Sequence, residues 1–158
     1  MVFLGIIVAY YGLIAVTGTD FLQPYLDVSA WIASGIIGLF SDNVYASGEF
    51  INGSGRSMAL SYGCDGTDQF IVFIAALVAF PAEWKKKAVG LAIGIGLLYA
   101  INIIRIVGLF YIFGRSVESF DLFHETILPL VFIALSLVMW YMWIKWKPGF
   151  ANSEVAVA

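Results

Sequence analysis

The chain has a single cysteine, Cys64, and a single histidine, His124, among its 158 residues. One cysteine excludes a disulfide within the chain, so we expect a free thiol. One cysteine and one histidine without metal-ligand spacing speak against a zinc site, and we expect neither a metal nor a cofactor. A phosphate-binding glycine loop is also missing, because the glycines of the run at 90–96, GLAIGIG, indicate close helix packing instead.

Charge is the second property that the sequence has little of. Only 12% of the residues are charged and 61% are hydrophobic, whereas soluble domains carry about 25% charged residues. So short a chain cannot bury this much apolar surface in one core, and we expect an integral membrane protein. The expected partner is the lipid bilayer, with no nucleic acid. The sequence predicts one membrane domain at 1–150 and a cytoplasmic tail at 151–158.

Four apolar stretches are candidates for membrane-spanning helices. The first has the apolar core of a signal peptide but lacks the preceding basic segment, so we expect it to be retained as a helix. The last ends in tryptophan and tyrosine residues that are typical of a membrane interface. The four predicted spans cover residues 2–17, 65–83, 88–113 and 126–145.

Two further segments lie between the first and second predicted spans. A shorter apolar stretch at 28–40 predicts a helix that lies in the membrane interface. The segment at 43–62 predicts a small outer β-hairpin, because Asn52-Gly53 is a dipeptide favoured in tight hairpin turns. The expected fold is therefore an all-α membrane bundle of about four transmembrane helices, with an interfacial helix and an extramembrane β-hairpin.

The basic residues predict the orientation of this bundle. Lys85–Lys87 join the second and third spans, and Lys145 and Lys147 follow the fourth. The positive-inside rule places both segments in the cytoplasm, and four crossings then place both termini there as well. Most of the acidic residues fall in the segments on the opposite side. We expect a multi-pass protein of the cytoplasmic membrane.

This topology brings three rare residues to one depth. Cys64 precedes the second span, Arg105 lies in the outer half of the third, and His124 precedes the fourth. Each has a structural alternative: a cysteine is often a buried apolar residue, a histidine a surface hydrogen-bonding group, and an arginine snorkels to headgroups. A charge inside a membrane helix nevertheless costs about 2.5–3.5 kcal/mol, which favours a functional arginine.

A thiol, an imidazole and a guanidinium together suit nucleophilic catalysis on an amide carbonyl. The imidazole of His124 would take the proton of Cys64 and pass it to the leaving amine. The guanidinium of Arg105 would stabilise the oxyanion. Asn102, one turn before Arg105, would brace the guanidinium or bind a substrate carbonyl.

Several neighbouring residues are predicted to support this site. The helix that follows Cys64 lowers the thiol pKa through its dipole, while nearby Asp65 and Asp68 oppose thiolate formation and cap the helix or hold the arginine. Glu125 is a candidate for orienting the imidazole. The roles of Arg56 and Arg115 stay open, and we expect headgroup or carboxylate contacts for both.

Three motifs resemble those of the exosortase/archaeosortase family. Tyr62–Gly66, YGCDG, resembles its cysteine motif, which has a Cys-x-Gly core formed here by Cys64 and Gly66. Asn102–Arg105 resembles its Asn-x-x-Arg motif, and His124 occupies the place of its third signature residue. The motifs occur in family order, and the resemblance covers about residues 43–146. The short, exosortase H-like members are the nearest in length.

The resemblance implies a membrane-embedded cysteine transpeptidase. Such enzymes recognise a C-terminal sorting tail, made of a short motif, a hydrophobic helix and basic residues, and transfer the cleaved protein to an acceptor. Cys64 would be the nucleophile, Arg105 would stabilise the acyl intermediate and His124 would handle protons. Two departures from the family are Asp65, where many members have a small hydroxyl residue, and the absence of the further spans that many longer members carry.

Two other interpretations remain open from the residues alone. The same three groups suit a thiol-dependent lipid hydrolase or acyltransferase, which would need Cys64 but no sorting tail. A non-enzymatic membrane assembly subunit would tolerate loss of Cys64 and require Arg105 as a charge partner for another helix. The sorting motif, the acceptor and the oligomeric state are not encoded in any pattern that we can interpret.

Overall fold

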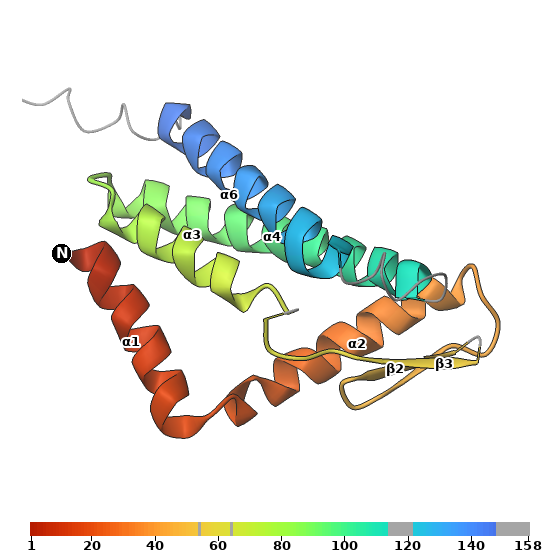
Figure 1. Ribbon diagram of the computed structural model, residues 1–158. Helices are drawn as coiled ribbons and strands as arrows, with labels where there is room; N and C mark the ends of the chain where they lie inside the picture. Colours follow the sequence, from red (N-terminus) through yellow and green to blue (C-terminus); the bar gives the residue numbers. More distant parts are fainter. Residues whose placement is uncertain (54, 64, 114–121, 148–158) are drawn as a thin grey trace, which may run out of the picture.

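The computed structural model describes residues 1–53, 55–63, 65–113 and 122–147. The described part of the chain is mainly helical with one small sheet, and Figure 1 shows how these elements are arranged. In chain order the elements are α1 (Val2–Thr17), the 3₁₀ turn η1 (Asp20–Leu22), α2 (Gln23–Gly38), β1 (Tyr45–Ser47), β2 (Phe50–Gly53), β3 (Arg56–Ala59), α3 (Thr67–Ala79), α4 (Trp84–Phe113), η2 (Phe123–Ile127) and α6 (Leu128–Lys145).

Two of the described helices, α4 and α6, are long and apolar enough to cross a membrane. The pair formed by α1 and the segment Asp20–Gly38 also passes this test, but the pair bends by 105° and counts as one further span at most. The 13 residues of α3 reach about 20 Å, less than the roughly 30 Å of a hydrocarbon core. The structure thus has two or three candidate spans, and the expectation of four stays a prediction.

The helices α3, α4 and α6 pack together, and α1 lies against α3 (Figure 1). Two glycines of α4 permit the close approach, as their spacing predicts. A Cβ atom at Gly90 would clash with the indole of Trp143 in α6, and one at Gly94 would clash with the ring of Phe73 in α3. Gly96 faces open space, so only two of the three glycines of GLAIGIG serve this contact.

The sheet is a three-stranded antiparallel meander in the order β1-β2-β3, one strand more than a hairpin. The predicted turn at Asn52-Gly53 is wrong, because both residues belong to β2 and pair with β3. The chain reverses instead beside Gly48 and Gly55, which have φ values of +59° and +74°. Glycine adopts these backbone conformations readily. Because the chain reverses on both sides of β2, Asn52 lies inside the strand.

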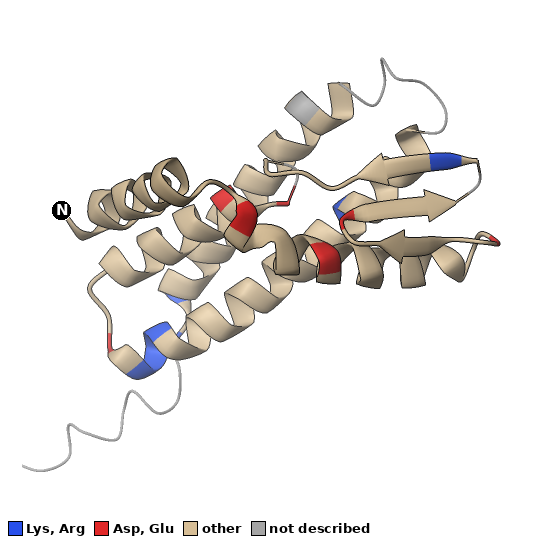
Figure 2. Cartoon of the chain, turned by 90° about the horizontal axis from the view of Figure 1, so that it is seen from below, with Lys and Arg blue, Asp and Glu red and all other residues tan. Residues whose placement is uncertain are grey.

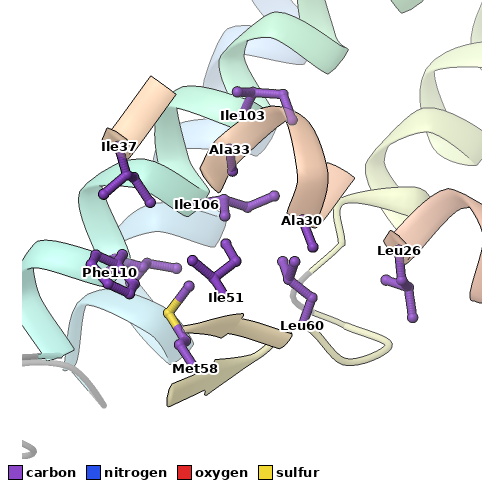
Figure 3. Close-up of a cluster of buried hydrophobic side chains, with 11 residues drawn as sticks. Leu26, Ala30, Ala33, Ile37, Ile51, Met58, Leu60, Ile103, Ile106 and Phe110 are labelled. Carbon is purple, nitrogen blue, oxygen red and sulfur yellow. The ribbon is translucent and has the colours of Figure 1, made fainter. Parts of the chain in front are cut away.

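A hydrophobic cluster joins the sheet to α2 and to the second half of α4. Figure 3 shows side chains of α2, of β2 and β3, and of α4 pointing toward one another. The helix α2 starts earlier than the expected 28–40 and buries one face in this cluster; its place in the membrane interface stays a prediction. The buried members are Leu26, Ala30, Ala33, Ile37, Ile51, Met58, Leu60, Ile103, Ile106, Leu109 and Phe110.

The lysines at the start of α4 hold the ends of two other helices. Lys87 donates a hydrogen bond of 2.7 Å to the carbonyl oxygen of Val78 in α3, and Lys86 donates one of 3.2 Å to that of Ile144 in α6. Cations favour the unpaired carbonyls at helix C-termini. Figure 2 shows this basic end and the acidic residues that lie mainly around the α1–α2 corner and the sheet.

Candidate functional site

The candidate site is built around the loop that connects β3 to α3. Cys64 itself lies outside the described residues, but the residues on both sides of it are described. Gly63 and Gly66 have φ values of +90° and +80°, so the loop turns sharply immediately before Cys64 and again just after it. Leu60 enters the loop buried in the hydrophobic cluster, and Thr67 begins α3. Both ends of the loop are therefore held by fixed elements.

The side chain of Asp65 folds the loop onto itself. Its Oδ1 accepts a hydrogen bond of 3.1 Å from the backbone N–H of Gly63, and its Oδ2 accepts one of 2.7 Å from the hydroxyl of Thr67. Asp65 is only 1% exposed, and this burial raises the pKa of its carboxyl group. The expected opposition of Asp65 to a thiolate at Cys64 stays a prediction.

The carbonyl oxygen of Asp65 fastens the loop to two other helices. It accepts a hydrogen bond of 2.6 Å from Nδ2 of Asn102 in α4 and one of 2.8 Å from the hydroxyl of Tyr25 in α2. Asn102 is fully buried. Its Oδ1 would lie 2.9 Å from a Cβ atom at Gly66, so only glycine fits at this approach. The predicted Asn-x-x-Arg motif thus starts with a residue that positions the cysteine loop.

Arg105 lies one helical turn beyond Asn102 and is 5% exposed. Its neighbours Ile103 and Ile106 are buried members of the hydrophobic cluster. A residue at this position lies about 27 Å along the helix axis from Lys87, close to a hydrocarbon thickness. The buried guanidinium therefore lies at the level of the cysteine loop and opposite to the basic end of α4.

His124 belongs to η2, a π-helical segment that runs directly into α6. Its ring is partly buried. Pro129 follows one turn later and has no N–H to donate, which removes an α-helical bond at this point. Single π-helical turns of this kind are rare and occur often at functional sites. The side chain of Glu125 lies outside the description, so its predicted contact with the imidazole stays a prediction.

The hydrophobic cluster brings the segments of all three predicted catalytic residues together. Leu60 precedes Cys64 by four residues, and Ile103 and Ile106 flank Arg105. Phe123 and Leu128, on either side of His124, pack against the same cluster. Elements that are distant in the sequence are therefore fixed to one another around the cysteine loop.

The hydrogen bonds of four tyrosines around this loop were not predicted from the sequence. Tyr25 contacts the Asp65 carbonyl, Tyr10 and Tyr11 fasten α1 to the start of α3, and Tyr62 joins the loop itself to Asp68. The only signal in the sequence is that a tyrosine in an apolar segment needs a hydrogen-bond partner for its hydroxyl group. Tyr10 donates a hydrogen bond of 3.0 Å to the hydroxyl of Thr67, while Tyr11 and Tyr62 donate bonds of 3.2 Å and 2.9 Å to Oδ1 of Asp68.

The structure describes contacts of the two predicted supporting carboxylates and of Arg56. Asp65 holds the loop and Asp68 holds two tyrosines. Arg56 in β3 donates a hydrogen bond of 3.1 Å to the carbonyl oxygen of Phe110 and lies 5.1 Å above its ring. It thereby caps the last turns of α4, and the expected headgroup or carboxylate contact stays a prediction. Arg115 lies outside the described residues.

A large apolar groove in the described part of the chain lies away from the cysteine loop. This groove of about 600 Å³ lies between α4 and α6 and includes Gly90, Leu97 and Trp143. It reaches Lys145 at the basic end, so it is separate from the cysteine loop. The residues that the structure describes contain no group of three or more metal-ligating side chains that could hold an ion.

Fold and site together define a multi-pass helical membrane protein with a cysteine-bearing loop fixed against a buried Asn-x-x-Arg helix. The family described as transmembrane exosortase (Exosortase_EpsH) matches residues 1–146. The chain therefore belongs to the transmembrane exosortase family, which confirms the family predicted from three short motifs. No curated protein and no solved structure matches it.

Proposed function

We propose that this protein is a membrane-embedded cysteine transpeptidase that cleaves C-terminal sorting tails and transfers the product to an acceptor. One observation carries the proposal. The loop that contains Cys64 is fastened through the Asp65 carbonyl to Asn102, one turn before the buried Arg105. Membership in the transmembrane exosortase family supports the same reaction class.

The reaction divides into two acyl transfers. In the first, His124 removes the thiol proton, and the sulfur of Cys64 attacks the carbonyl carbon of the scissile peptide bond. Arg105 stabilises the oxyanion that forms, a task favoured by its buried position. The C–N bond then breaks, the imidazolium gives its proton to the leaving amine, and a thioester remains on Cys64. In the second transfer, the acceptor nucleophile attacks the thioester and releases the thiol.

The proposed topology has four crossings of the cytoplasmic membrane, with both termini inside and the site on the outer face. The length of α4 between Lys87 and Arg105 supports this assignment, since it is close to a hydrocarbon thickness. A substrate tail with a hydrophobic helix and a basic end would lie in the same membrane with its basic end at the cytoplasmic side. This alignment would position the scissile bond beside Cys64, and positioning of the reacting groups lowers the entropic part of the activation barrier.

The test is co-expression of a protein from the same organism that carries such a tripartite tail, followed by an immunoblot. We expect a smaller product with the wild-type chain and none with Cys64→Ala. In Arg105→Lys we expect much slower processing, because a lysine keeps the charge but not the planar, forked donors. Membrane insertion and abundance of each variant are measured in parallel.

The outcomes separate the proposal from its rivals. Identical bands for wild type and Cys64→Ala, with both forms inserted, would contradict thiol-dependent processing of that substrate. Thiol-dependent turnover of a lipid ester without tail processing would favour the hydrolase or acyltransferase. Loss of a larger complex in Arg105→Ala, with Cys64→Ala unaffected, would favour the assembly subunit.

A further inference from the structure

We propose that the free edge of β3 binds the substrate segment next to the scissile bond as an added β-strand. This inference rests on the proposed function and names how that site would recognise its substrate. In the described part of the chain β3 pairs only with β2, so its other side is an edge of the sheet. Addition of an extended peptide to such an edge is a recurring mode of peptide recognition.

The register of the sheet shows which backbone groups this edge offers. The N–H of Leu60 donates a hydrogen bond of 3.0 Å to the carbonyl oxygen of Glu49, and Met58 pairs with Ile51. Hydrogen-bonded pairs alternate along an antiparallel ladder. The N–H and C=O groups of Ser57 and Ala59 therefore point away from β2. They alternate along the chain with Met58 and Leu60, whose backbone groups point toward β2.

The edge is rigid rather than frayed. On one face of β3, Met58 and Leu60 are buried in the hydrophobic cluster, 6% and 1% exposed. At the start of the strand, Arg56 holds the end of α4 through its hydrogen bond to Phe110. A strand fixed in this way loses little conformational entropy when a peptide pairs with it.

The edge also leads directly to the nucleophile. Ala59 precedes Cys64 by five residues, so at most about 18 Å of extended chain separates the edge from the cysteine. The peptide that pairs along β3 would continue toward the cysteine loop. Gly63 turns the chain just before that loop, which shortens the distance further.

The two outward-facing positions of this edge, Ser57 and Ala59, carry none of the usual protection against strand addition. Natural edge strands are often guarded by a charge, a proline or a bulge. Ser57 and Ala59 are small, neutral and exposed. The opposite edge strand, β1, packs against α2 instead. Recognition at β3 would involve mostly backbone, so it selects an extended peptide conformation with little demand on side chains.

Proline substitutions test this proposal because they remove one outward N–H each. We compare Ser57→Pro and Ala59→Pro with Ser57→Ala and Ala59→Val in the co-expression assay with the tripartite-tailed protein. We expect processing to fall by about tenfold or more in each proline variant, as one or two hydrogen bonds are lost, and to fall much less in Ser57→Ala and Ala59→Val, which keep the backbone N–H. Processing by folded proline variants within about twofold of wild type would overturn the proposal.

A photocrosslinking measurement keeps the proposal testable if the proline variants do not fold or if no processing is seen. A benzoylphenylalanine is placed at Ala59 or, as the matched control on the other edge, at Tyr45, both in the Cys64→Ala background. We expect a crosslink to the tailed protein from position 59 and none from position 45. Equal or stronger crosslinking from position 45 would overturn the edge assignment. Wild type without processing, but with the expected crosslink, would contradict the transpeptidase and leave the binding edge standing.

Discussion

Asn102 donates a hydrogen bond of 2.6 Å from its Nδ2 to the carbonyl oxygen of Asp65, which lies 37 residues earlier in the chain. The bond joins α4 to the loop that contains Cys64. Tyr25 donates to the same oxygen at 2.8 Å. One backbone carbonyl thus fastens the predicted nucleophile loop to two helices at once.

Replacing both donors should destabilise the protein by more than the sum of the two single replacements. Asn102→Leu and Tyr25→Phe each leave the Asp65 carbonyl with one partner, at a cost of about 1 kcal/mol. The double variant leaves a buried carbonyl without either, which costs about 1–3 kcal/mol more. Unfolding in detergent micelles measures all three variants. Strict additivity would contradict a shared role for the two donors.

Gly66→Ala should be more destabilising than Gly63→Ala. Both substitutions place a side chain at positive φ, a strain of roughly 1–2 kcal/mol. A Cβ at Gly66 would also meet Oδ1 of Asn102 at 2.9 Å, whereas one at Gly63 meets nothing within 4 Å. Relief of that contact would displace the hydrogen bond to Asp65. We expect Gly66→Ala to lose processing as well, and equal unfolding midpoints for the two variants would contradict the close approach.

Two glycines of α4 should respond to alanine with opposite signs. Gly90→Ala would clash with Trp143 of α6 and should destabilise the bundle by about 1–3 kcal/mol. Gly96 faces open space, so Gly96→Ala should gain up to about 1 kcal/mol of helix propensity. Thermal unfolding of the two variants in the same detergent measures the difference. A stabilising Gly90→Ala would show that α4 and α6 pack differently.

The family and the packing glycines could be predicted because both depend on local residue patterns. Gly90 and Gly94 are one helical turn apart and need no knowledge of the partner helix. The number of strands could not be predicted, since Asn52-Gly53 satisfies a turn preference that the reversals beside Gly48 and Gly55 override. The turn preference of a dipeptide is weak, and the pairing of the strands decides where the chain reverses.

The tyrosine contacts could not be predicted for a different reason. Tyr10 and Thr67 are 57 residues apart, and no periodicity within α1 indicates which helix its phenol meets. The 105° bend between α1 and the following segment is likewise set by packing of α2 against the sheet and α4. Hydropathy alone therefore identifies apolar helices but does not establish which of them cross the membrane.

The stability of the protein relative to an Asp65→Asn variant should fall as the pH rises above 4. Burial raises the pKa of the Asp65 carboxyl group above its ordinary value of about 3.9. Below that value both the folded and the unfolded protein hold the proton, and the carboxyl group adds no pH dependence. As the pH rises toward the raised folded-state pKa, the unfolded protein loses the proton first, so the free energy of unfolding decreases.

Asparagine does not titrate, so the difference in unfolding midpoint between the two proteins isolates this group. We would measure both in detergent micelles from pH 4 to pH 7, in steps at constant ionic strength. The expected result is that the unfolding midpoint of the wild type falls relative to that of Asp65→Asn as the pH rises. The opposite trend would mean that the hydrogen bonds from Gly63 and Thr67 favour the charged carboxylate by more than burial disfavours it.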